Sequence, residues 1–169
     1  MAQRQDAEKI TTVINSAFRG AEEFFVEGDR VDVGEVLNFL SSGKFLLAES
    51  EHTLLGCVYV EHRHRHLDSN HSSAESGGRA YLGLLAVDPA HQQSGLGTML
   101  MEAAEDHCRA LGLGFMDIKV VNLREELAGF YGKRGYVETG TSAFPAEVET
   151  KLRCHFIDMS KPLDADKAT

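Results

Sequence analysis

The sequence predicts an α/β or α+β fold, in which helices cover a sheet that contains some parallel strands. Segments with helical spacing of apolar residues alternate with apolar segments of strand length. The second half of the chain is ordered strand–helix–strand–helix–strand, and strands joined through a helix usually pair in parallel. The 169 residues are enough for one domain, so we expect a single domain over residues 1–169.

The N-terminal part predicts two helices and a hairpin. Apolar residues recur at helical spacing in Asp6–Phe18 and in Asp32–Ser41. Lys44–Ser50 and Leu54–Glu61 are short apolar segments separated by a polar turn, which is typical of two antiparallel strands. Few residues precede the first of these helices, which leaves little room for a strand before it.

The segment from His62 to Arg79 is polar throughout, and we interpret it as a long exposed loop. Its start alternates histidine with arginine, from His62 to His66. Three histidines on one face of a strand suit zinc. However, no acidic or thiol fourth ligand lies at a fixed spacing nearby, and the interleaved arginines would repel a cation. We therefore expect no metal site.

The second half begins with an almost entirely apolar run, which predicts a strand buried on both faces. Glycines at positions 112 and 135 mark the ends of two helices. We expect, in order, a strand at Tyr81–Val87, a helix at Gly95–Leu111, a strand at Phe115–Val121, a helix at Leu123–Arg134, and strands at Tyr136–Thr139 and Cys154–Met159.

Composition and charge exclude several classes of protein. A net charge of −9 disfavours a general nucleic-acid binder. No apolar run approaches the ~20 residues of a membrane span, and the polar N-terminus does not resemble a signal peptide. Three scattered cysteines are too few for a disulfide framework. We expect a cytoplasmic protein with neither a nucleic-acid nor a membrane partner.

The segment from Leu85 to Thr98 predicts an anion site. A buried strand runs into a turn, and a glycine-containing turn opens a helix whose first backbone N–H groups lack internal partners. These groups and the helix dipole favour a phosphate, and Gly95 and Gly97 carry no side chain that would block it. No lysine completes a Walker loop, and no third glycine completes a Rossmann fingerprint. A turn glycine and a packing glycine would explain the pair equally well.

Three motifs in order make the pattern more specific. Gln92-x-x-Gly95-x-Gly97 follows an apolar strand that ends in Val-Asp-Pro, Asn122 follows the next strand, and Phe130-Tyr131-x-x-x-Gly135-Tyr136 closes the following helix. The chain resembles the GCN5-related N-acetyltransferase (GNAT) superfamily over about Lys44 to Leu163, most closely from Tyr81 to Tyr136. In that family a mixed, twisted sheet is flanked by helices and two central strands splay apart.

The resemblance implies that acetyl-CoA enters the gap between the strands Tyr81–Val87 and Phe115–Val121. Backbone groups of Leu85 and Val87 would pair with its pantetheine arm as an added strand does, and Asn122 would face the thioester. The backbone from Gln92 to Thr98 would hold the pyrophosphate. The full set of expected cofactor-binding residues is Leu85, Ala86, Val87, Gln92, Gln93, Ser94, Gly95, Leu96, Gly97, Thr98 and Asn122.

The resemblance also implies direct attack of an amine on the thioester, with Tyr131 as the general acid that protonates the CoA thiolate. From helical spacing alone, Tyr131 is as well explained as a core residue. Some family members carry a glutamate six residues before the valine at the end of the central strand, where this chain has Tyr81. Glu61, Asp117 and His155 are the substitute candidates for the general base, and loss of the proton through water is an alternative.

The resemblance also implies that the acceptor site lies near the first two helices, the loop between them and the last strands. Glu23, Phe24 and Tyr81 are the expected substrate-binding residues. Glu22, Glu23 and Glu27 would attract a cationic amine, although a solvated face explains them better. The family's first strand is short or missing here, so a second copy of the chain would be able to cover the open sheet edge as a homodimer.

We expect an acetyl-CoA-dependent N-acetyltransferase that acts on a primary amine of a small molecule. Two alternatives remain open. One is a noncatalytic acyl-CoA-binding module on the same fold, which the missing carboxylate at Tyr81 favours and the retained Tyr131 disfavours. The other is acetylation of a protein or peptide, which would need an open groove.

Overall fold

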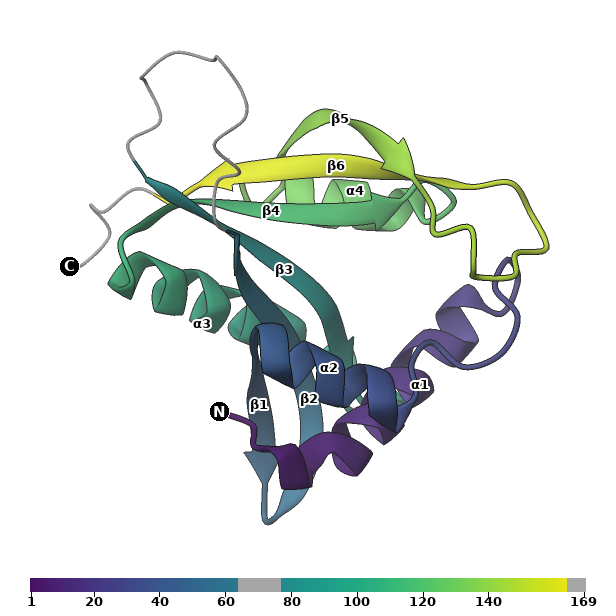
Figure 1. The fold of residues 1–169 in the computed structure, drawn as a ribbon, viewed down its shortest axis with the longest axis horizontal. Coiled ribbons are helices and arrows are strands. Elements are labelled where there is room, and N and C mark those ends of the chain that lie inside the picture. Colours follow the sequence, from purple (N-terminus) through teal and green to yellow (C-terminus); the bar gives the residue numbers. More distant parts are fainter. Residues whose placement is uncertain (64–76, 164–169) are drawn as a thin grey trace.

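A computed structural model of the protein describes residues 1–63 and 77–163 (Figure 1). Its helices are α1 (Ala7–Glu22), α2 (Val33–Ser42), α3 (Leu96–Ala110) and α4 (Glu125–Gly132), with short 3-10 turns at Arg4–Asp6 and Pro89–His91. Its strands are β1 (Lys44–Ser50), β2 (Thr53–Arg63), β3 (Gly78–Val87), β4 (Leu113–Val121), β5 (Val137–Ala143) and β6 (His155–Pro162).

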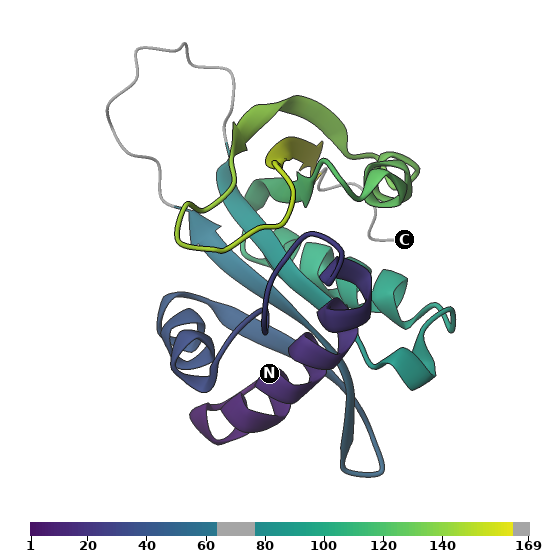
Figure 2. The same cartoon turned by 90° about the vertical axis from the view of Figure 1, so that its right-hand side faces the viewer.

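The six strands form one mixed sheet in the order β1-β2-β3-β4-β6-β5. All neighbouring pairs are antiparallel except β3 and β4, which are parallel because α3 connects them across the sheet. Helices α1 and α2 pack on one face of the sheet, and α3 and α4 pack on the other (Figure 2). This arrangement confirms the fold class predicted from the sequence.

The central strands β3 and β4 separate part of the way along their length (Figure 1). They pair from Gly78 to Tyr81 on β3, and no strand among the described residues pairs with the remainder of β3 on that side. The pairing of β2 with β3 shifts register nearby, and Leu84 has a φ of 48°. A leucine rarely adopts this left-handed conformation, and such a bulge bends its strand. The bend turns the end of β3 away from β4, which produces the expected splay.

The N-terminal edge of the sheet lacks the additional strand of the family pattern. Among the described residues, none before α1 forms a strand, and the chain enters that helix through the 3-10 turn. The backbone N–H of Ala2 donates a 3.0 Å hydrogen bond to the carbonyl oxygen of Phe45 in β1. The first residues therefore cover only part of the β1 edge.

Several element boundaries differ from the sequence predictions. Helix α1 continues one turn beyond Phe18 to Glu22, whereas α4 is shorter than the predicted helix at both ends. Strands β2 and β3 extend into the segment that was predicted to be a loop, so His62 and Arg79 belong to strands. Residues 64–76 of that predicted loop lie outside the described residues. Pairing with neighbouring strands accounts for the longer strands β2 and β3, and local residue patterns do not reveal that pairing.

Candidate active site

A cavity of about 710 Å³ opens where β3 and β4 separate. Residues 81–85 and Val87 of β3 form one wall, and residues 118–121 of β4 form another. Helix α1 and the loop after it line one end of the cavity. Gln92, which precedes α3, and Gly97, in the first turn of α3, line another part of the cavity. The splay therefore joins the predicted anion site to the predicted acceptor region in one space.

The two glycines at the start of α3 have different roles. Gly95 has a φ of 82° and is the N-cap of the helix, so it is a turn glycine. A Cβ atom built on Gly97 would meet only Cγ2 of Val87, at 3.8 Å, which is an ordinary contact. Gly97 is therefore not required by packing within the protein. Because it also lines the cavity, the space above it is open to a ligand.

Other residues of the predicted anion site hold the turn in place. The Gln92 side chain donates to the carbonyl oxygen of Val87 at 3.3 Å, and the Ser94 hydroxyl donates to that of His91 at 2.6 Å. The Thr98 hydroxyl accepts a 2.8 Å hydrogen bond from Arg134, which follows α4. Gly95, the N-cap residue, has no side chain that could cap the first N–H groups of α3. These donors remain available at the helix start.

The predicted cofactor residues divide into two groups in the structure. Leu85, Val87, Gln92 and Gly97 line the cavity. The others are not among the lining residues. Ala86 is buried on the α1 side of the sheet and Leu96 packs against the core under α3. The side chain of Asn122 accepts a 2.8 Å hydrogen bond from the backbone N–H of His155, and its own N–H donates to the carbonyl oxygen of His155 at 3.0 Å. Asn122 thus joins the end of β4 to the start of β6.

Tyr131 lies in the cavity wall, on the buried face of α4. Its ring contacts Phe130 and Tyr136 edge to face, with centroid distances of 5.2 and 5.5 Å. Burial raises the pKa of Tyr131 to about 12, although the positive charges of Arg124 and Arg134 oppose the shift. The phenol is therefore protonated at neutral pH and can donate a proton or a hydrogen bond into the cavity.

Tyr81 lies at the last paired position before β3 leaves β4, and its ring also lines the cavity. The ring lies against Gly83, where a built Cβ would come within 2.8 Å of it. The guanidinium of Arg63 lies over the Tyr81 ring, 4.2 Å from the ring centroid. Burial raises the pKa of Tyr81. The phenol therefore stays protonated, and it can donate a hydrogen bond but does not replace the carboxylate as a base.

The three candidate bases lie outside the residues that line the cavity. Asp117 forms a two-point ion pair with Arg79, at 2.8 Å from Nε and 2.6 Å from Nη2. Lys119, two residues farther along β4, forms its ion pair with Asp158 on β6 at 3.0 Å. Glu61 lies opposite Tyr81 on β2, and His155 is exposed at the start of β6. None of the three directs a carboxylate or imidazole into the described cavity wall.

The acceptor end of the cavity contains Glu22, which the sequence pattern placed on a solvated face. That expectation is wrong, because the extra turn of α1 carries Glu22 inward and leaves the residue 8% exposed. Glu23 and Phe24 are exposed instead, and neither lines the large cavity. The sequence does not reveal this difference, since Glu22 and Glu23 are adjacent residues of the same type.

Two loops are joined over this end of the molecule. Val26 forms an antiparallel bridge with Thr150, and the N–H of Lys151 donates to the carbonyl oxygen of Phe25 at 2.8 Å. The two loops, from α1 to α2 and from β5 to β6, approach each other beyond the end of α1 in Figure 1. A third apolar cluster, which includes Phe25 and Phe156, packs beneath them.

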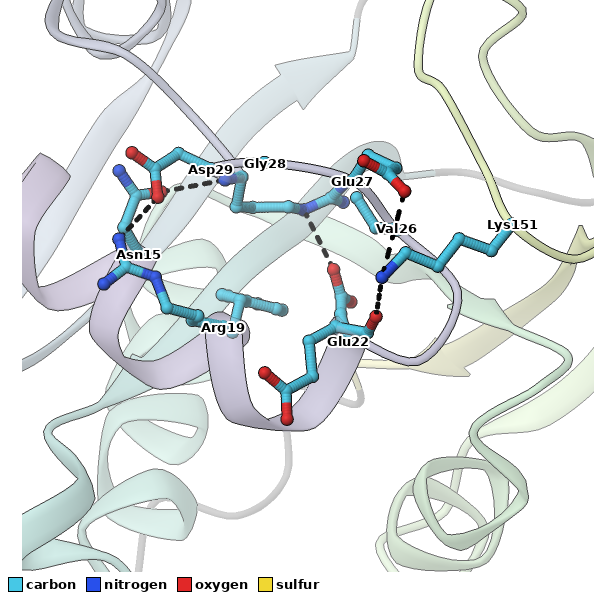
Figure 3. Close-up of a pocket in the computed structure, with 11 residues that line it drawn as sticks. Asn15, Arg19, Glu22, Val26, Glu27, Gly28, Asp29 and Lys151 are labelled. Carbon is cyan, nitrogen blue, oxygen red and sulfur yellow. Dashed lines mark hydrogen bonds and ion pairs between the residues drawn. The ribbon is translucent and has the colours of Figure 1, made fainter.

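A smaller hollow of about 240 Å³ adjoins the end of α1 (Figure 3). Its charges are largely paired. Arg19 and Asp29 lie 2.6 Å apart, Lys151 lies 3.9 Å from Glu27, and Arg30 lies 3.8 Å from Glu22. Glu22 lines both this hollow and the large cavity.

Within residues 1–63 and 77–163, no three metal-ligating side chains cluster together. His64 and His66 of the histidine–arginine segment lie outside the described residues. None of the described helices has the length and apolar character needed to cross a membrane.

Comparison with solved structures finds the same fold in acetyltransferases. The ribosomal-protein-S18-alanine N-acetyltransferase of Escherichia coli matches with a TM-score of 0.70 at 15% identity, covering 99% of this chain and 95% of that one. A GNAT-family acetyltransferase of Staphylococcus aureus Mu50 matches at 0.68 and 20%, over 96% of each chain. Nourseothricin acetyltransferase matches at 0.57 and 21%, over 73% of this chain and 66% of that one. At such identities the likeness shows the fold.

Sequence comparison identifies the family independently of the fold. A search of curated proteins finds no significant match. The model of the acetyltransferase (GNAT) family matches residues 10–136, which include most of α1, the splayed strands, the start of α3 and Tyr131. The chain therefore belongs to the acetyltransferase (GNAT) family and is an acyltransferase enzyme.

Proposed function

We propose that the protein transfers an acetyl group from acetyl-CoA to a primary amine of a small molecule. The observation that carries this proposal is the single cavity, which connects the open start of α3 with Tyr131 and then with the acidic end of α1. A donor and an acceptor bound from the two ends would meet beside Tyr131.

The cavity suits acetyl-CoA at its α3 end. Gly97 leaves open a space that a side chain would fill, and the first N–H groups of α3 can bind a pyrophosphate. The part of β3 that has left β4 offers its backbone to the pantetheine arm, as an added strand would require. Leu85, Val87, Gln92 and Gly97 would contact the cofactor. Gln93, Ser94 and Thr98 would support the turn around it.

Acetyl-CoA supplies an acetyl thioester whose carbonyl carbon reacts with an amine. Tyr131 would donate its proton to the departing sulfur, because burial keeps the phenol protonated. The backbone N–H of Val87 would polarise the thioester carbonyl. Arg124, which lines the cavity, places a positive charge on the same side as Tyr131 and would stabilise negative charge on sulfur.

A small acceptor is favoured by the joined loops at the other end. The bridge between Val26 and Thr150 connects the two segments that border the acceptor region. Aromatic residues, among them Phe18, Phe144 and Phe156, supply much of the lining there. An extended peptide would have to pass beside or between the joined loops. The E. coli neighbour is named for a protein acceptor, so a peptide N-terminus is the second candidate.

The test measures thiol release from acetyl-CoA with a panel of amines. The panel contains small primary amines, amino acids, polyamines, aminoglycosides, and peptides with a free N-terminus or a lysine. Multiple turnovers with a small amine and none with peptides would support the proposal. Turnover with peptides alone would show that the acceptor is a peptide or protein amine and not a small molecule. Tight acetyl-CoA binding without turnover on any acceptor would favour a noncatalytic acyl-CoA-binding module.

A further inference from the structure

The side chain of Glu22 is largely buried, and its carboxylate has an ion-pair partner but no close hydrogen bond within the described residues. The side chain is 10% exposed, and no described residue donates a hydrogen bond to its oxygens. Its cationic neighbour, Nε of Arg30, is 3.8 Å from Oε2, and this Nε is itself buried without a hydrogen-bond partner. Buried polar groups are normally hydrogen-bonded. Nε of Arg30 therefore leaves one donor unused beside Glu22 at the cavity wall.

Glu22 shares charged neighbours with the two tyrosines at the proposed reaction centre. The positive charge of Arg124 lowers the pKa of both Glu22 and Tyr131, so both lie near the same guanidinium. Arg30 likewise acts on Glu22 and on Tyr81. Glu22, Tyr81 and Tyr131 also line the same cavity.

The surroundings of Glu22 suit a group that exchanges protons. Burial raises the pKa of its carboxyl, and the charges of Arg30 and Arg124 oppose this shift only in part. Burial raises the pKa of the Cys154 thiol, just before β6, and the charge of Glu22 adds to this shift. A carboxylate whose pKa moves toward the working pH is a more effective proton acceptor than an exposed one.

We propose that Glu22 is the general base that removes the proton from the attacking amine. It would perform the task of the carboxylate that Tyr81 replaces on β3. The inference rests on the proposed function, and it favours Glu22 over Glu61, Asp117 and His155 because Glu22 lines the cavity and those three residues do not.

The proposed step is balanced in bonds and protons. The amine nitrogen bonds to the acetyl carbon, and the carbon–sulfur bond breaks. The nitrogen loses one proton to Glu22, and the sulfur gains one from Tyr131. Solvent then takes the proton from Glu22 and returns one to Tyr131, so the products are the N-acetylated amine and the CoA thiol.

The experiment compares wild-type enzyme with Glu22→Gln, which keeps the side-chain size and removes the base. With the best amine of the panel, we expect kcat to fall by about 100-fold or more. The affinity for acetyl-CoA should stay within about twofold, because Glu22 lies at the other end of the cavity. Wild-type kcat should fall at low pH as Glu22 becomes protonated, and the variant should lose this dependence.

Glu8→Gln is the matched control, because Glu8 is an exposed glutamate in the same helix, about 21 Å away at 1.5 Å per residue. It should retain wild-type kcat. A second measurement uses enzyme without acetyl-CoA. The carboxyl ¹³C resonance of Glu22, identified by its absence in Glu22→Gln, should shift when the amine is added.

The outcomes separate the inference from the proposed function. An active wild-type enzyme whose kcat and pH profile are unchanged in Glu22→Gln would overturn the assignment of the base alone. An amine that leaves the Glu22 resonance unmoved would also overturn it. A wild-type enzyme with no turnover on any acceptor would overturn the proposed function, and this inference with it.

Discussion

Arg79 and Asp117 form a two-point ion pair across β3 and β4, next to the position where these strands separate. The guanidinium contacts both carboxylate oxygens, at 2.8 and 2.6 Å, and also donates to the Ser160 hydroxyl on β6 at 2.9 Å. The ion pair thus connects three strands immediately behind the splay. Asp117, which the sequence offered as a candidate base, occupies a position where it holds the sheet together.

This arrangement predicts that Asp117→Asn costs stability more than catalysis. Loss of the charge removes the two-point ion pair from a partly buried guanidinium, which we expect to cost about 2 kcal/mol and lower Tm by roughly 5 °C. Asp106→Asn is the matched control, since Asp106 pairs with Arg109 but its side chain is 75% exposed. Thermal unfolding and kcat should be measured on both. A collapse of kcat in a normally stable Asp117→Asn enzyme would restore Asp117 as a base.

Gly97→Leu should abolish acetyl-CoA binding while leaving the fold intact. A Cβ at this position meets only Val87 at ordinary contact distance, so the protein can accommodate the side chain, which would then fill the cofactor space. Replacing a helical glycine should even raise stability, by up to about 1 kcal/mol. Calorimetric titration with acetyl-CoA is the measurement. Gly129→Leu in α4, another helical glycine with open space around it, should bind normally. Wild-type affinity in Gly97→Leu would refute the placement of the cofactor.

Tyr131→Phe should lower kcat by about 100-fold and leave acetyl-CoA affinity nearly unchanged. The hydroxyl is proposed to act only in the transition state, so its loss should not weaken ground-state binding. Tyr136→Phe is a useful contrast, because the Tyr136 hydroxyl donates to the buried Glu105 at 3.0 Å and should affect stability instead. Steady-state kinetics at saturating amine distinguishes the two variants. An unchanged kcat in Tyr131→Phe would remove this tyrosine from the mechanism.

Glu22→Gln should be as stable as wild type at pH 8, or more stable. Burial raises the pKa of Glu22 in the folded state, so the folded protein holds this proton more tightly than the unfolded chain. The resulting contribution is present at low pH and is lost as pH rises through the folded-state pKa. Any advantage of the variant should therefore shrink as the pH is lowered. A Tm several degrees below wild type at pH 8 would show that the Arg30 ion pair outweighs the cost of burial.

The sequence anticipated the order of the elements because that order follows from local patterns. Apolar spacing located the helices and strands to within a few residues, and strand pairing extended β2, β3, β5 and β6 beyond their predicted ends. The glycines at the start of α3 and the Phe130–Tyr136 signature were recognisable for the same reason, since each motif is contiguous in the chain. The family model that matches residues 10–136 confirms the resemblance read from those motifs.

The site was only partly predictable, because its acidic residues are distributed by long-range contacts. Glu22 and Glu23 are adjacent, yet one is buried in the cavity wall and the other is exposed. Asp117 and Asp158 look like free carboxylates in the sequence and are paired with Arg79 and Lys119 in the structure. Which acid is available for chemistry depends on which cations reach it, and those cations lie on other strands.

The sequence by itself determined the fold class, the family and the position of Tyr131, since these depend on periodicity and on contiguous motifs. Only the tertiary structure decided that Leu84 bends β3 away from β4, that Gly97 is free of packing constraints, and that Glu22 faces the same cavity as Tyr131. Each of these features arises where segments distant in the chain meet or separate. A pattern within one segment does not encode the neighbours that other segments provide.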